Sequence, residues 1–108
     1  MTLLVELSDK REFVDIVRRL YRAIRQFSIE SAPETILFWR EAAVEGGVEV
    51  IYLVPLKPPD SDWVVWRCRE RVPPEAVGES VESTLAEVGL DRALKVNSLK
   101  VDGEELAK

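Results

Sequence analysis

The sequence contains no histidine and a single cysteine, Cys68. Without histidine, the catalytic arrangements in which an imidazole activates a serine or cysteine nucleophile cannot form. One cysteine without histidine also excludes an ordinary structural zinc site, and it leaves no partner for an internal disulfide. We therefore expect a non-enzymatic protein that uses no metal and no cofactor and that works in the reducing cytoplasm.

Long hydrophobic runs are missing as well. The apolar stretch near the N-terminus is short and is broken by Glu6, which predicts neither a secretory signal nor a membrane span. The chain holds 20 acidic and 15 basic residues, a net charge of -5, and this balance argues against a protein that coats nucleic acid or an anionic membrane. The sequence therefore predicts no membrane association.

Thermolabile side chains are scarce. The chain has one glutamine, one asparagine and one methionine, whereas Glu, Arg and Val are abundant. Depletion of amides and sulfur together with many ion-pairing residues is typical of proteins that work at high temperature. The composition therefore indicates a thermophile.

One domain covering residues 1–108 is expected. With 46% hydrophobic residues, a chain of 108 residues suffices for one core and is too short for two ordinary domains. Apolar residues recur at three- and four-residue steps through 9–28, and Asp9 and Glu12 have capping-box spacing. This segment is predicted to form an amphipathic helix.

Three strands are predicted after this helix. Two β-rich runs, 34–44 and 48–56, flank the pair Gly46–Gly47, which indicates a hairpin. A third run, 63–72, alternates between two faces. A pair of prolines then opens a second helix, which is predicted to end at Gly89.

This order of helix, three strands and helix predicts an α+β fold. We expect an antiparallel sheet of three to five strands with two helices packed on one face. Residues 2–7 and 94–101 are optional further strands. If they form, the alternative is a ferredoxin-like arrangement with one extra strand, and neither architecture identifies a function.

Both faces of the predicted hairpin are largely apolar. A two-residue turn at Gly46–Gly47 places Trp39 beside Val54 on one face, and it places Phe38 and Leu53 on the other. A sheet covered by two helices needs only one apolar face, so either the terminal segments or another subunit must cover the second. The second alternative predicts an assembly subunit that self-associates, as a homodimer, or that binds a protein partner.

The alternation of the strand at 63–72 sets Trp63, Val65, Arg67, Arg69 and Arg71 on one of its two faces. Arginines beside an aromatic side chain are typical of protein hot spots and of single-stranded nucleic acid sites. The predicted interaction surface comprises Trp63, Val65, Arg67, Arg69, Arg71, Phe38, Arg40 and Leu53. We expect it to bind protein; a nucleic-acid-binding accessory protein that uses the arginines and the tryptophan of this strand is the alternative. The same alternation turns Cys68 away from the arginines, so this thiol is expected to be a small core hydrophobe.

Overall fold

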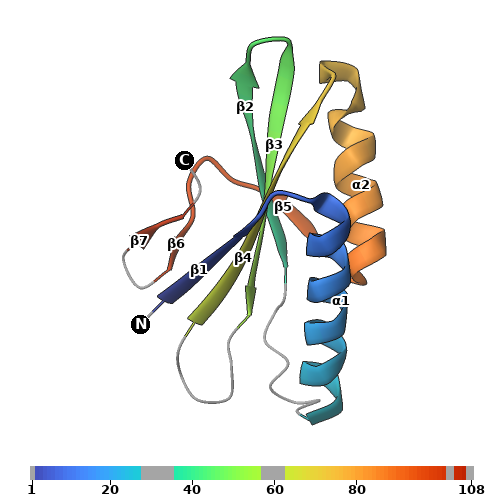
Figure 1. The fold of residues 1–108 in the computed structure, drawn as a ribbon, viewed down its shortest axis with the longest axis vertical. Helices are drawn as coiled ribbons and strands as arrows, with labels where there is room; N and C mark the ends of the chain where they lie inside the picture. Colours follow the sequence, from blue (N-terminus) through green and yellow to red (C-terminus); the bar gives the residue numbers. More distant parts are fainter. Residues whose placement is uncertain (1, 28–35, 57–62, 102–103, 107–108) are drawn as a thin grey trace.

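The computed structural model describes residues 2–27, 36–56, 63–101 and 104–106. Its principal elements lie in an α+β order of strand, helix, three strands, helix and strand (Figure 1). The connection between the second and third predicted strands, residues 57–62, lies outside the described residues. In chain order the elements are β1 (Thr2–Leu7), α1 (Lys10–Phe27), β2 (Leu37–Val44), β3 (Gly47–Leu56), β4 (Trp63–Val72), the 3-10 turn η1 (Pro74–Ala76), α2 (Val77–Val88), β5 (Ala93–Lys95), β6 (Lys100–Val101) and β7 (Glu104–Glu105).

Five strands form the main sheet in the order β1-β4-β3-β2-β5. The central strands β2, β3 and β4 form the expected antiparallel meander, but β1 pairs parallel to β4 and β5 pairs parallel to β2. The prediction of an antiparallel sheet was therefore wrong, because the sheet is mixed. The reason is that α1 connects β1 to β2, and α2 connects β4 to β5. A helix between two strands returns the chain to the end from which it started, so the strands that it connects run in the same direction.

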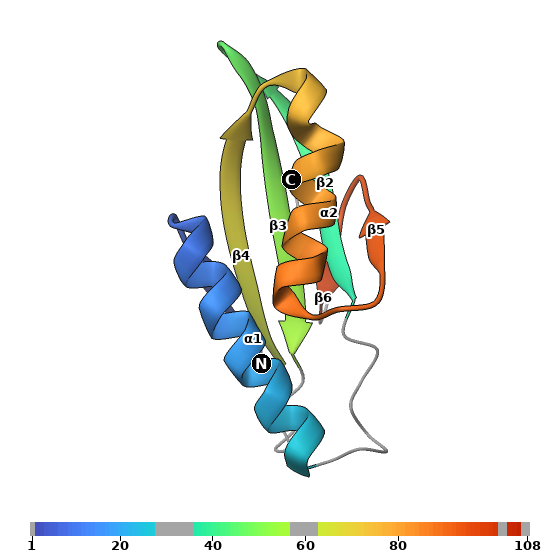
Figure 2. The same cartoon turned by 90° about the vertical axis from the view of Figure 1, so that its right-hand side faces the viewer.

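Both helices cover one face of this sheet (Figure 2). The α1 helix begins after Asp9, whose Oδ1 accepts a hydrogen bond of 2.8 Å from the backbone N–H of Arg11. The α2 helix ends at Gly89, whose φ of 74° is the left-handed conformation expected of a C-terminal glycine. The helix-side core, a cluster that includes Phe13 and Tyr52, is formed where these helices meet the sheet.

The hairpin turn lies one residue earlier than predicted. Val44 pairs with Gly47, so the loop consists of Glu45 and Gly46 rather than the two glycines. Gly46 has a φ of 83°, which glycine adopts readily, whereas a Cβ on Gly47 would lie 2.9 Å from the backbone oxygen of Val72. The register therefore shifts by two residues, and because side chains alternate, the predicted division into two faces is unchanged.

The optional strand at 94–101 does not form as one element, because this part of the chain contains two short strands, β5 and β6. β5 ends at Lys95, after which the N–H of Val96 donates to the carbonyl of Trp39. Further along, β6 pairs with β7 in a separate two-stranded sheet, and residues 102–103 between them lie outside the described residues. The chain thus leaves the sheet edge and passes over the face that the helices leave uncovered.

Candidate interaction surfaces

All eight residues of the predicted interaction surface lie on the sheet face opposite the helices. The pairing registers place Leu53 between Phe38 and Arg67, and they place the remaining members on the same side of β2, β3 and β4. The middle of this surface is closed, however, because Leu53 and Val65 are both 0% exposed. These two residues therefore cannot contact a partner in this conformation.

The chain's own C-terminal segment closes this face. Val96, Leu99 and Leu106, together named the C-terminal cover, pack in one cluster with the apolar side chains of β3 and β4. Leu106 is 4% exposed, and its N–H donates a 2.6 Å hydrogen bond to the carbonyl of Leu99. Of the two coverings considered for the second apolar face, the terminal segment accounts for its centre.

The strand arginines make ion pairs within the chain. Arg67 Nη2 lies 2.7 Å from Glu6 Oε2, and Arg69 lies 3.0 Å from Glu6 and 3.4 Å from Glu49. The hydrogen bond from Arg67, reinforced by the charges of both arginines, outweighs burial and lowers the pKa of Glu6. A nucleic acid phosphate would compete with carboxylates for these two guanidinium groups.

The rim of the predicted surface is more accessible. Arg71 is exposed, and Trp63, Phe38 and Arg40 are intermediate. The Nη1 of Arg40 donates to the backbone carbonyl of Asn97, which follows the sheet edge. The structure thus divides the predicted surface into a covered centre and an accessible rim.

The two edges of the main sheet differ in how they are protected. β5 has three residues and carries Lys95, whereas β1 has six residues and contains neither lysine nor proline. The one charged side chain of β1, Glu6, is engaged by the arginines of β4. Short edges, lysine and proline are the usual devices that prevent strand-to-strand association. The described part of β1 has none of them.

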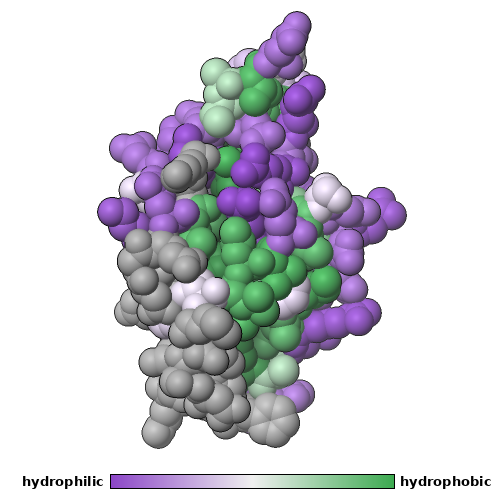
Figure 3. Space-filling model, turned by 60° about the vertical axis from the view of Figure 1, so that its left-hand side comes forward, coloured by the Kyte–Doolittle hydropathy of each residue, from purple (hydrophilic) through white to green (hydrophobic). Residues whose placement is uncertain are grey.

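Apolar side chains are accessible along β1. Leu3 is 57% exposed, the highest value among the large hydrophobic residues described, and Leu4 and Val5 are intermediate. Figure 3 turns the β1 side of the molecule towards the viewer and shows hydrophobic side chains gathered in the middle, with hydrophilic ones above and to the right. Exposed apolar area beside open backbone groups is typical of a site where another strand is added.

A polar network lies under the helices, on the opposite side of the sheet. Lys10 on α1 and Glu70 on β4 form a 3.0 Å ion pair, and Ser80 on α2 donates a 2.6 Å hydrogen bond to the same carboxylate. The Tyr52 hydroxyl donates to Glu70 at 3.0 Å. The network therefore links α1 and α2 to the strands β3 and β4.

The titration of this network supports a structural role. Burial opposes ionisation of Glu70, but the hydrogen bonds from Ser80 and Lys10 outweigh it and lower the pKa of that carboxyl. Burial is also the main cause that raises the pKa of Tyr52 to about 12. The phenol is therefore neutral and the carboxylate is ionised at neutral pH, each held by hydrogen bonds within the network.

Sequence reasoning missed this network, although a signal was present. Within 63–72, Glu70 is the one charged residue on the face that otherwise carries Val64, Trp66 and Cys68. A carboxylate on the apolar face of a strand needs partners, because an unpaired buried charge is costly. The pattern alone could have predicted a buried ion pair, but it could not have named Lys10.

Cys68 lies in the helix-side core, as expected. It is 0% exposed, and burial is the main cause that raises the pKa of its thiol to about 11. Reactive cysteines instead have lowered pKa values and accessible sulfur atoms. Among the described residues, no group of three or more histidine, cysteine or acidic side chains could hold a metal ion.

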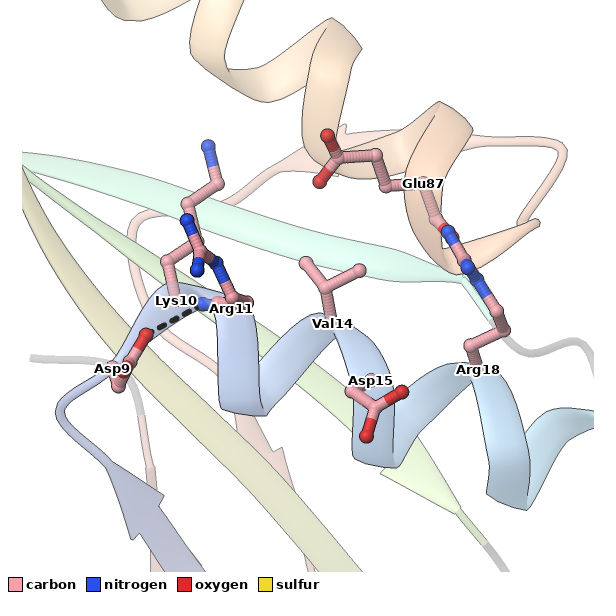
Figure 4. A pocket seen from close by; sticks show the side chains of 7 residues that line it. All are labelled: Asp9, Lys10, Arg11, Val14, Asp15, Arg18 and Glu87. Carbon is pink, nitrogen blue, oxygen red and sulfur yellow. Dashed lines mark hydrogen bonds between the residues drawn. The ribbon is translucent and has the colours of Figure 1, made fainter.

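A groove runs between the two helices (Figure 4). Arg18 spans it and donates a 2.8 Å hydrogen bond from Nε to the backbone carbonyl of Glu87, near the end of α2. The groove is lined by Val14 together with Lys10, Arg11, Arg18, Asp9, Asp15 and Glu87. Because the lining carries three basic and three acidic side chains, it does not select a ligand of either charge.

Comparison with protein-family models, with curated proteins and with solved structures finds no match for this chain. Within the described residues, no helix is both long enough and apolar enough to cross a lipid bilayer. The features that bear on function are therefore the edge strand β1, the covered sheet face, the rim arginines and the helix-side network.

Proposed function

We propose that this chain is a non-enzymatic assembly subunit that associates with a second copy of itself along the edge strand β1. The observation that carries the proposal is the state of this edge: six residues long, without lysine or proline, with Leu3 57% exposed. From Leu3 to Leu7, the outer side of β1 pairs with no other strand among the described residues. Addition of another strand there would pair its backbone groups and cover the apolar side chains.

The proposal places the interface at the edge of the sheet rather than on its face. Contact through the face would require Leu53 and Val65, and both lie under the C-terminal cover. Trp63 pairs with the start of β1, so it lies beside the edge and within reach of an interface there. The expected self-association is kept, and its site is moved.

Binding of nucleic acid has less support. Single-stranded nucleic acid sites combine free positive charge with exposed aromatic faces. Arg67 and Arg69 are engaged by Glu6 and Glu49. An interaction that replaced these ion pairs would gain less than one made with free guanidinium groups.

The test is the mass of the protein in solution, measured by sedimentation equilibrium over a range of concentrations. We expect a dimer, and we expect Leu3→Lys to raise its dissociation constant at least about tenfold, because each interface would bring two ammonium groups beside apolar side chains. The matched control is Leu94→Lys, the same change at a 44% exposed leucine on the other edge strand. It should leave the dissociation constant unchanged.

Two results would contradict the proposal. One is a wild-type protein that stays monomeric at every concentration measured. The other is a dimer that the two lysine variants weaken equally. If the monomeric protein bound single-stranded RNA with an affinity that fell steeply with added salt, the nucleic acid alternative would replace self-association.

A further inference from the structure

We infer that two copies pair their β1 strands antiparallel around a two-fold axis that passes beside Leu4. The five-stranded sheets of the two copies would join into one sheet of ten strands, with all helices on the same side. This inference rests on the proposed self-association and adds the relative orientation and the register of the two copies.

The side chains of β1 divide between the two faces of the sheet. Their parallel pairing with β4 sets Leu3, Val5 and Leu7 on the side of the helices, since their partners include Cys68 of the helix-side core. Leu4 and Glu6 lie on the opposite side, and Leu4 packs with the second apolar cluster.

Symmetry restricts how two such strands can pair. In a closed dimer the two-fold axis makes each contact occur twice. An axis perpendicular to the sheet makes two β1 edges run antiparallel and keeps the helices of both copies on one side. Residues that lie directly opposite each other then point to the same face of the joined sheet. This requires the axis to pass beside one residue, which then lies opposite the same residue of the other copy.

Two registers of this kind use five of the six residues of β1. A centre at Leu4 sets Leu3 opposite Val5 of the other copy and sets Thr2 opposite Glu6. A centre at Val5 instead sets Leu4 opposite Glu6. The first register pairs apolar with apolar and polar with polar, whereas the second places a carboxylate against a leucine.

The other two-fold axis that could exchange two β1 edges lies in the plane of the sheet, along the strands. It would make the two strands run parallel and would place the helices of the two copies on opposite sides. Side chains at the same height would then point to opposite faces, which a regular β-ladder does not allow. The Leu4-centred pairing gives Leu3 an apolar neighbour and leaves Glu6 at the end of the ladder, where it keeps its arginine partners on β4.

The inference is tested by cysteine cross-linking of the full chain under mild oxidation. The native thiol of Cys68 is fully buried, so it should not contribute cross-links. Directly opposite residues of an antiparallel pair have Cβ atoms about 4.5–5.5 Å apart, which is close to the distance a disulfide spans. We expect Leu4→Cys to form a covalent dimer and Val5→Cys alone to remain uncross-linked.

A second measurement avoids replacing Leu4, which packs on the sheet face. A mixture of Leu3→Cys protein and tagged Val5→Cys protein should give a covalent dimer that contains one copy of each. Neighbouring pairs in an antiparallel ladder alternate between a wider and a closer type, so one of the two experiments always falls on the closer type. A cross-link in either experiment, with none from Val5→Cys alone, supports the register.

The outcomes separate the register from the proposed function. A protein that is dimeric by mass but cross-links through Val5→Cys alone overturns the Leu4-centred register and leaves self-association standing. A dimeric protein that gives no cross-link in any of these experiments overturns pairing through β1. A protein that is monomeric by mass and gives no cross-link overturns both.

Discussion

Replacement of Leu106 by alanine tests whether the C-terminal cover is packed on the sheet in solution. Leu106 is 4% exposed and packs with Ile51, Leu53 and Val65, which are themselves at most 1% exposed. Removing a buried leucine side chain costs about 2–5 kcal/mol, and the lower part of this range applies where the surroundings can relax. The cover lies at the outside of the fold, so we expect Leu106→Ala to lower the free energy of unfolding by about 2–3 kcal/mol.

The measurement is urea denaturation followed by tryptophan fluorescence, at equal concentrations of the two proteins because association adds to stability. Leu94→Ala is the matched control, since this leucine is 44% exposed, and it should change the free energy of unfolding by no more than about 0.5 kcal/mol. If both variants unfolded at the same urea concentration as the wild type, Leu106 would not be packed in solution. The sheet face would then be open, and the case for an interface at the edge rather than on the face would fail.

Three further predictions concern the helix side and the turns. Because its contacts lower the pKa of Glu70, the stability from this carboxylate is present above its ordinary value of 4.5 and is lost as the pH falls below it. Glu70→Gln should lower the free energy of unfolding by about 1–3 kcal/mol at neutral pH and flatten its acid dependence in urea titrations; an unchanged acid dependence would contradict the assignment. Gly47→Ala should lower the melting temperature, because its Cβ would lie 2.9 Å from the Val72 oxygen, whereas Gly78→Ala, with nothing within 4 Å in α2, should raise it; the reverse order would refute the turn geometry. Cys68 should react with a thiol reagent far more slowly in the folded than in the urea-unfolded protein, and equal rates would show that its burial is not maintained.

Local patterns predicted the elements whose period is unambiguous. The strand β4 has the predicted bounds, 63 and 72, because its side chains alternate over its whole length. The helix α1 was predicted at 9–28 and spans Lys10–Phe27, since its apolar stripe and its capping residue agree. Periodicity reports which side of an element is buried, and in these cases one side is clearly apolar.

Local patterns could not predict which strands pair when they lie far apart in the sequence. β1 was recognised only as an optional strand, and its place at the edge depends on pairing with β4, which follows much later in the chain. A terminal segment was one of the two expected covers of the second apolar face, but the residues that form the C-terminal cover were not identified. Val96, Leu99 and Leu106 follow neither a helical nor a strand period, so periodicity did not indicate that they would pack there.

For the predicted interaction surface, too, local patterns predicted one property and could not predict another. Alternation correctly divided the side chains of each strand between two faces, and the two-residue shift in the hairpin register leaves this division unchanged. Accessibility could not be predicted in this way. Leu53 and Val65 are apolar side chains on the face opposite the helices. A segment far away in the sequence covers them and prevents contact with a partner.

Arg67 connects the two ends of the chain energetically. Its Nη2 donates to Glu6 of β1, its Nη1 donates to the carbonyl of Leu106, and its Nε is buried without a hydrogen-bond partner among the described residues. The Arg67 side chain is only 14% exposed, so these acceptors compensate its charge for the loss of water. When either acceptor moves away, the guanidinium is left poorly compensated, so detachment of one end of the chain weakens the attachment of the other. One buried guanidinium thus couples the attachment of the N-terminal strand to that of the C-terminal cover.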